Sequence, residues 1–314
     1  MRTSRNLVIL SRSFGKASEE PFRYLEENNI QYKISRNSTP ENVEFIAKEI
    51  GDAQAVIVGS DIISEYVMDR CPNLRLVSKQ GVGLDSVDLD LAKVRNIKVT
   101  NTPDANNESV ADLCLLFMLY LSRKIGDNLI KSKTPNWETK NLSNDLYGKT
   151  VGLVGFGQIG QATARRLQGF DCKVLVHDPY IQTSALSTQY VETVDLDTLF
   201  KESQILSLHM PATPETKHFI NESSIAKLQP GVMIINTSRG ALIDEDVLYK
   251  ALKDGRIGSA GLDVFAMEPP VDNPILILPN VICTPHIAPH TVEANYRMGM
   301  AAAQNVVNFF NENM

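Results

Sequence analysis

Three glycines at fixed spacing mark the most informative stretch of the chain. Gly155, Gly157 and Gly160 follow an apolar run that begins at Val151, and a segment with helical spacing comes after them. Glycine accepts the backbone angles of a sharp strand-to-helix turn, and its missing side chain lets the main chain approach a phosphate. Amide groups at the start of the following helix also attract anions. The pattern predicts a site for the pyrophosphate of a dinucleotide.

An acidic residue completes this unit. The apolar run 173–177 predicts a second strand, and Asp178 follows it, where a carboxylate can accept hydrogen bonds from both ribose hydroxyls. This carboxylate would repel a 2′-phosphate, and Pro179 and Tyr180 supply no positive charge to offset it. The unit therefore favours NAD over NADP. The alternative is a glycine-rich turn that binds no ligand. The strand, helix, second strand and acid that surround the glycines together argue against it.

Strands and helices alternate along the rest of the chain. Short runs typical of strands lie at 7–10, 32–34, 55–58, 74–77, 97–99, 205–209, 233–236, 259–264 and 281–284. Segments of helical length lie at 19–28, 41–50, 109–123, 158–167 and 292–310. Such alternation implies parallel sheets, in which ligand-binding residues gather at the carboxyl ends of the strands. We expect an α/β fold.

Composition excludes several classes of function. The net charge of −6 and the charged fraction of 22% give no electrostatic reason to bind nucleic acid or an anionic membrane. The four cysteines are widely spaced, which predicts neither a metal site nor a disulfide framework and fits a reducing cytoplasm. The apolar run 7–10 is too short for a signal peptide, and the run 113–121 is half the length of a membrane span.

Six further motifs occur in order along the chain. They are Gly81 to Asp85, Asn101 to Pro103, His209 to Pro211, Asn236 to Gly240, Gly261 to Pro269 and Thr284 to Ala288. With the glycine turn, they resemble the D-isomer-specific 2-hydroxyacid dehydrogenase family, which includes phosphoglycerate dehydrogenases and glyoxylate/hydroxypyruvate reductases. The resemblance covers about residues 55–289.

This resemblance implies two doubly wound parallel-sheet domains with the active site between them. A Rossmann NAD-binding domain would span 102–287. A smaller flavodoxin-like substrate domain would combine 1–101 with 288–314. The implied reaction transfers a hydride between NAD(H) and a small anionic D-2-hydroxy acid/2-oxo acid pair.

Three catalytic residues follow from the resemblance. Arg239 corresponds to the arginine that binds the substrate carboxylate, Glu268 to the acid partner, and His286 to the proton donor and acceptor. Histidine suits this role because it exchanges a proton near neutral pH, and a neighbouring carboxylate orients the ring. A guanidinium can pair with a carboxylate through two hydrogen bonds. His290 is a weaker candidate, because the Thr-Pro-His setting selects His286.

Further contacts are implied by the same motifs. Besides Gly155, Gly157, Gly160 and Asp178, the implied cofactor contacts are Val110, Gln158, Ile159, His209, Met210, Pro211, Thr216, Thr237 and Asp263. The implied substrate contacts, besides Arg239 and His286, are Lys79, Val82 and Gly83. A plain tight turn is the alternative for the segment around Val82 and Gly83.

Two positions depart from the phosphoglycerate dehydrogenase pattern. Gly59 stands where those enzymes usually carry an arginine, and Lys79 stands at a second basic position. A lysine replaces a bidentate guanidinium poorly, so we do not expect 3-phosphoglycerate as the substrate. Lys79 instead indicates a second acidic group or a polar tail on the substrate. Glu268 argues against formate oxidation, whereas phosphite oxidation stays open.

The family resemblance also implies a homodimer, with residues Ser122 to Tyr147 as the contact region. Trp137 in this stretch is either part of an intersubunit arm or packed on its own domain. The alternative from a different class of function is an NAD-sensing, corepressor-like binding protein. Such proteins share the fold of the dehydrogenase family and can retain its catalytic residues. The chain shows no long disordered tail or basic arm, which favours the enzyme.

Overall fold

The computed structural model describes residues 5–36, 39–133, 137, 142–181 and 190–312. The chain forms two compact units, the first made of Met1–Asn106 and Pro289–Met314 and the second of Asn107–Ala288. From the sequence we expect the chain to pass between domains after residues 101 and 287. Each unit is described by itself.

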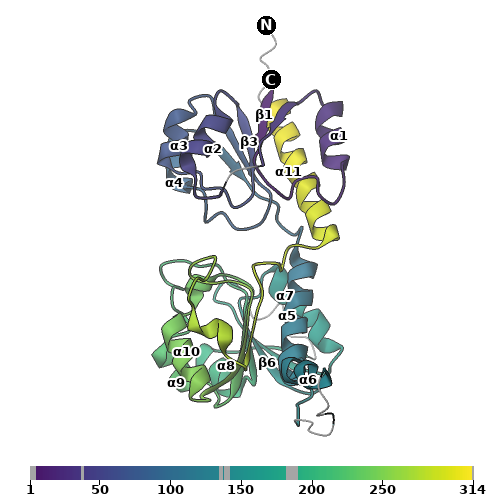
Figure 1. The fold of residues 1–314 in the computed structure, drawn as a ribbon, viewed down its shortest axis with the longest axis vertical. Helices are drawn as coiled ribbons and strands as arrows, with labels where there is room; N and C mark the ends of the chain where they lie inside the picture. Colours follow the sequence, from purple (N-terminus) through teal and green to yellow (C-terminus); the bar gives the residue numbers. More distant parts are fainter. Residues whose placement is uncertain (1–4, 37–38, 134–136, 138–141, 182–189, 313–314) are drawn as a thin grey trace. The chain divides into compact units, whose positions relative to one another are not determined.

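The first unit contains a five-stranded parallel sheet (Figure 1). Its strands are β1 (Asn6–Ile9), β2 (Gln31–Ile34), β3 (Ala55–Val58), β4 (Leu76–Lys79) and β5 (Lys98–Thr100). They are arranged in the order β2-β1-β3-β4-β5, which is the flavodoxin-like order. The predicted doubly wound substrate-domain fold is confirmed.

Helices cover both faces of this sheet (Figure 1). They are α1 (Glu20–Glu27) and α11 (Val292–Glu312) on one face, and α2 (Val43–Ile50), α3 (Glu65–Arg70) and α4 (Leu89–Val94) on the other. Side chains alternate along β1, because Val8 packs into the core beneath α2 and α3 and Leu7 into the core beneath α1 and α11. The C-terminal helix therefore completes the unit that the N-terminal residues begin.

The second unit contains a seven-stranded parallel sheet in the order β12-β11-β10-β9-β6-β7-β8. The strands are β6 (Thr150–Val154), β7 (Lys173–His177), β8 (Val191–Thr193), β9 (Ile205–Leu208), β10 (Val232–Asn236), β11 (Ile257–Leu262) and β12 (Val281–Cys283). The strand order reverses between β6 and β9, and dinucleotides bind at such a reversal in Rossmann folds. The predicted Rossmann fold is confirmed. The three-residue strand β8 at the edge is not anticipated by the sequence pattern.

Two cores lie on opposite faces of the larger sheet. Helices α5 (Asn107–Ser122) and α7 (Gln158–Gln168) cover one face, and α8 (Leu196–Glu202), α9 (Glu222–Lys227) and α10 (Glu245–Lys253) cover the other (Figure 1). Two 3-10 turns, Gly240–Leu242 and Pro274–Ile277, belong to the second layer. Helix α5 packs so closely on β11 that a Cβ at Gly261 would lie 2.8 Å from Phe117. The remaining helix, α6 (Ile125–Ser132), has no buried residue.

In the described ranges, no helix is long and apolar enough to span a bilayer. Within the same ranges, no three His, Cys, Asp or Glu side chains gather as metal ligands. All four cysteines are free thiols, and only Cys283 is partly exposed.

Candidate active site at the carboxyl edge of the seven-stranded sheet

The glycine turn joins β6 to α7, and each glycine is required for a different reason. Gly155 has a φ of +91°, and a Cβ there would lie 2.6 Å from the main-chain oxygen of His209. A Cβ at Gly160 would lie 2.6 Å from the Gly155 oxygen, so this glycine allows the helix to pack on the turn. No atom lies within 4 Å of a Cβ built at Gly157. The first and third glycines thus serve packing, while the second leaves open space at the helix N-terminus.

Asp178 is bound to the glycine turn. Its Oδ2 accepts a hydrogen bond of 2.8 Å from the Phe156 amide, and its Oδ1 accepts one of 2.9 Å from the Tyr180 amide. These contacts hold the carboxylate beside the start of α7, whose first two residues are Gln158 and Ile159. An acid at this place, next to open space for a phosphate, fits NAD.

His209 follows β9 at the same edge. Its Nε2 lies 2.9 Å from the Ser207 hydroxyl, and its buried Nδ1 has no hydrogen-bond partner among the described residues. Burial lowers the pKa of His209 to about 4, so the ring is neutral at physiological pH and is unsuited to donate a proton. A buried ring nitrogen without a partner also fits a site that holds a polar ligand.

The other implied cofactor contacts lie in the core beneath α5 or in the loop after β9. Val110 is buried in the core beneath α5, and the Thr237 hydroxyl lies 3.1 Å from the Cys114 Sγ. Thr216 belongs to the loop after β9, where its hydroxyl donates a hydrogen bond of 2.8 Å to the Pro211 oxygen. Met210, in the same loop, is half-buried. Their contact with the cofactor stays a prediction.

The structure pairs two of the three predicted catalytic residues. Nδ1 of His286 lies 2.8 Å from Oε2 of Glu268, and Oε1 of Glu268 accepts a hydrogen bond of 3.1 Å from the Phe265 amide. Burial alone would raise the pKa of Glu268, but its interactions with His286, the Phe265 amide and the charge of Arg239 lower it. Glu268 is therefore ionised at neutral pH and able to orient the imidazole.

Arg239 lies close enough to this pair for its charge to lower the pKa of Glu268. It follows β10, and its Nη1 donates a hydrogen bond of 2.6 Å to the Ser238 oxygen. The next residue, Gly240, packs so tightly on the loop after β11 that a Cβ there would lie 1.8 Å from the carbonyl carbon of Phe265. The arginine, glutamate and histidine thus come from loops that follow three adjacent strands, β10, β11 and β12.

One supporting residue is absent from the sequence predictions. Glu245, at the start of α10, accepts hydrogen bonds of 2.6 Å from the Ala266 amide and 2.6 Å from the Asn273 side chain. It thereby ties down the loop that carries Glu268. An acid in the first turn of a helix is common, so nothing in the sequence marks this one as special.

The implied substrate contacts Lys79, Val82 and Gly83 belong to the first unit. The Lys79 ammonium donates a hydrogen bond to the main-chain oxygen of Gly59. The turn before Val82 is held by Thr102, whose amide donates a hydrogen bond of 3.0 Å to the Gly81 oxygen. The side chain of Asn101 donates one of 2.7 Å to the Val82 oxygen.

These bonds explain why Asn101 and Thr102 accompany the glycine pair in the sequence. Substrate binding by Lys79, Val82 and Gly83 stays a prediction.

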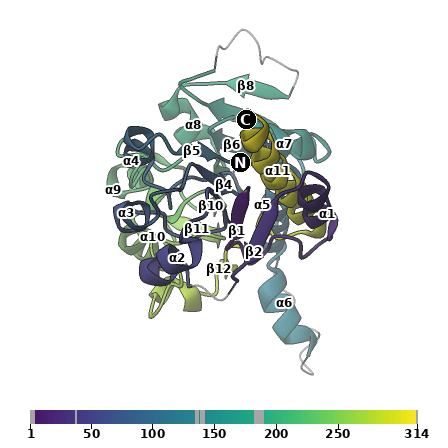
Figure 2. The ribbon, with the colours of Figure 1, turned by 90° about the horizontal axis from the view of Figure 1, so that it is seen from above.

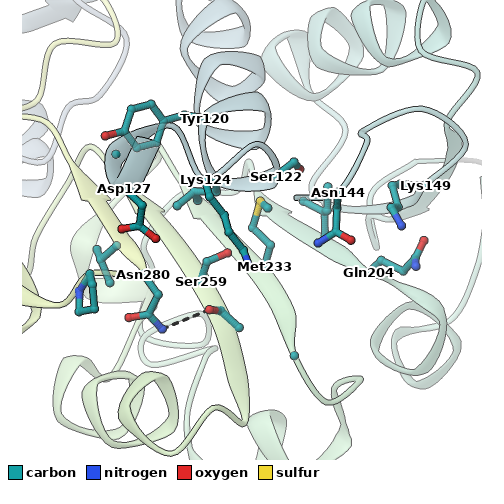
Figure 3. Close-up of a pocket in the computed structure, with 17 residues that line it drawn as sticks. Tyr120, Ser122, Lys124, Asp127, Asn144, Lys149, Gln204, Met233, Ser259 and Asn280 are labelled. Carbon is teal, nitrogen blue, oxygen red and sulfur yellow. Dashed lines mark hydrogen bonds between the residues drawn. The ribbon is translucent and has the colours of Figure 1, made fainter. Parts of the chain in front are cut away.

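A separate pocket lies at the opposite, amino-terminal edge of the larger sheet (Figure 3). Its lining includes Lys124, Met233, Ser259 and Asn280, and the Asn280 side chain donates a hydrogen bond of 3.1 Å to the Gly258 oxygen. None of the predicted cofactor, substrate or catalytic residues lines it. This pocket is distinct from the candidate active site.

Comparisons with known proteins agree with this geometry. Residues 115–288 match the family model described as D-isomer specific 2-hydroxyacid dehydrogenase, NAD binding domain. The chain is 42% identical to a hydroxypyruvate reductase of Thermotoga maritima, over 85% of this chain and 89% of the relative. It is 37% identical to a D-3-phosphoglycerate dehydrogenase of Methanocaldococcus jannaschii, over 92% of this chain but 55% of the relative. The chain thus spans about half the length of that enzyme.

A solved structure of D-lactate dehydrogenase from Aquifex aeolicus, in complex with NAD and lactic acid, is also similar. The TM-score is 0.85 and the identity 31%, covering 98% of this chain and 96% of the other. The predicted cofactor, NAD, is confirmed by these matches. The chain belongs to the D-isomer specific 2-hydroxyacid dehydrogenase family and is an NAD-dependent oxidoreductase.

Proposed function

We propose that the chain interconverts a short 2-oxo acid and its D-2-hydroxy acid, with His286 exchanging the proton. The observation that carries this assignment is the 2.8 Å contact between His286 Nδ1 and the Glu268 carboxylate. A carboxylate on one ring nitrogen fixes the orientation of the imidazole and stabilises its protonated form. Nε2 is then the nitrogen that gives a proton to the substrate oxygen or takes one from it.

Bound NADH supplies the hydride in the reductive direction. Arg239 binds the substrate carboxylate through two parallel hydrogen bonds, which orients the carbonyl and polarises it. Glu268 is ionised beside His286, because the interactions with His286, the Phe265 amide and the charge of Arg239 lower its pKa. His209 is neutral and contacts the cofactor region without exchanging a proton.

For the substrate, we propose an acid of the glyoxylate or hydroxypyruvate type. The support is the Thermotoga relative, a hydroxypyruvate reductase, together with a glyoxylate reductase of Korarchaeum cryptofilum that is 36% identical over 90% of the chain. Gly59 offers no guanidinium for a phosphate, and the Lys79 ammonium donates to the Gly59 oxygen. The position of the usual phosphate-binding arginine thus carries no positive charge in this chain.

The test follows NADH oxidation by the purified protein with glyoxylate, hydroxypyruvate, pyruvate and longer 2-oxo acids, and NAD reduction with 3-phosphoglycerate. We expect turnover with the short acids and little with 3-phosphoglycerate. His286→Ala should abolish turnover while NADH affinity is nearly intact, and His290→Ala serves as the matched control. Tight NADH binding without turnover of any acid would favour the NAD-sensing alternative.

We further propose that the protein is a homodimer, formed in part by helix α6. This helix extends away from the sheet of its unit (Figure 2), and Leu129 and Ile130 on it are 51% and 70% exposed. Trp137 and Leu142 in the following stretch are also exposed. Apolar side chains gathered in this way are typical of a protein interface. Residues 134–136 and 138–141 of the predicted contact region lie outside the described residues.

The four free thiols fit a reducing compartment, and we propose the cytoplasm.

A further inference from the structure

His286 adopts an unusual backbone conformation. Its φ is +53°, in the left-handed region that a histidine rarely occupies. Such a conformation persists only when neighbouring groups hold it, and it is found preferentially at functional sites. Neighbouring groups must therefore hold the backbone of His286 in this conformation.

Several hydrogen bonds to one residue on the adjacent strand end provide this support. Asp263 follows β11, and its main-chain oxygen accepts a hydrogen bond of 2.9 Å from the His286 amide. Its Oδ1 accepts bonds of 2.6 Å from the Thr284 hydroxyl and 2.8 Å from the Ile287 amide. Its Oδ2 accepts a bond of 2.8 Å from the Ala288 amide. Asp263 therefore binds the chain on both sides of His286 and at His286 itself.

The Asp263 side chain is fully buried, with 0% of its surface exposed. A buried carboxylate is tolerated only when donors compensate it, and here three donors from the 284–288 loop do so. These donors occupy most of its acceptor capacity. A role at the nicotinamide amide, which the family resemblance implies, would need a further donor to reach this buried group.

We propose that Asp263 is a positioning residue, which holds His286 in the left-handed conformation that brings Nδ1 to Glu268. This inference rests on the proposed role of His286 as the proton donor. Because the loop is bound on both sides of the histidine, a small change at Asp263 moves the imidazole.

The first test variant is Asp263→Asn. An amide has the same shape but offers one acceptor oxygen, so its NH2 group must face either the Ala288 amide or the pair formed by the Thr284 hydroxyl and the Ile287 amide. At least one hydrogen bond to the loop is lost. We expect kcat for 2-oxo acid reduction to fall at least tenfold, while the Kd of NADH, measured by fluorescence titration, changes less than twofold.

A second variant, Thr284→Val, removes one donor to Asp263 and leaves the carboxylate in place. We expect a smaller loss in kcat, about threefold, with the same unchanged NADH affinity. Thermal unfolding of both variants shows whether they fold. If Asp263→Asn does not fold, the kcat and the NADH affinity of Thr284→Val test the proposal.

The decisive experiment is a double-mutant cycle with His286→Ala, using the residual rate at high enzyme concentration. If Asp263 acts through His286, Asp263→Asn should cost nothing further once the imidazole is gone. An equal loss in both backgrounds, or a tenfold weaker binding of NADH with unchanged kcat, would overturn the proposal. Normal turnover of His286→Ala alone would instead refute the proposed function, so the two failures are distinguishable.

Discussion

The contact between Glu268 and His286 allows a quantitative prediction for Glu268→Gln. The carboxylate accepts two hydrogen bonds, one at 2.8 Å from His286 and one at 3.1 Å from the Phe265 amide. A glutamine side chain has one acceptor oxygen, so it cannot serve both donors.

A hydrogen bond to a charged group contributes about 1.5–3 kcal/mol, against about 1 kcal/mol for a neutral one. Because the two side chains are 45% and 37% exposed, solvent screening places the loss near the lower end of this difference. We take about 0.5–1 kcal/mol, which corresponds to about a two- to fivefold fall in kcat.

The assay compares kcat for glyoxylate and hydroxypyruvate reduction at saturating NADH, with the Kd of NADH measured separately. We expect the Kd to stay within twofold, because Glu268 does not belong to the glycine turn. Asp272→Asn is the matched control: it removes an exposed carboxylate from the same loop, and asparagine tolerates the positive φ of 56° at that position. An unchanged kcat in Glu268→Gln, or an equal fall in the control, would refute the reasoning.

Three other predictions concern the second unit. In the unfolded chain His209 takes up a proton near pH 6.5, but its folded-state pKa is about 4, so stability should fall by up to about 3 kcal/mol from pH 6.5 to 4. Urea unfolding of His209→Gln should lack this slope. Gly155→Ala should lower the melting temperature even without cofactor, because its Cβ meets backbone at 2.6 Å, whereas Gly157→Ala should leave it unchanged yet weaken NADH binding at least tenfold. Leu129→Asp should convert a dimer to a monomer in sedimentation, and an unaltered mass would exclude α6 from the interface.

Much of the fold follows from local pattern. The strand predicted at 55–58 coincides with β3, and the helix predicted at 158–167 differs from α7 by one residue at its end. Both carry strong signals, a continuous apolar run and a glycine turn followed by helical periodicity. The strand β8 carries no such signal, because it is a three-residue edge strand. Helix α6 is not among the predicted helices although its apolar residues Ile125 and Leu129 lie four positions apart, and none of its residues is buried.

The candidate site likewise has one part that the sequence predicts and one part that it does not. The glycine turn and Asp178 lie within one continuous supersecondary unit, so spacing along the chain suffices to predict the cofactor. Glu245 and Asp263 act through hydrogen bonds to loops about twenty residues away in the sequence, between the ends of adjacent elements. No local pattern reports such partners.

The sequence by itself determined the α/β class, the NAD site and the family motifs, because each depends on residues close together in the chain or on an ordered set of motifs. Only the tertiary structure decided that the Glu268 carboxylate meets His286, that Asp263 is fully buried and that His286 is held in a left-handed conformation. These properties depend on how three parallel strands bring their carboxyl ends to one edge. Parallel pairing joins segments that are distant in the sequence, so their contacts are set by the folded sheet.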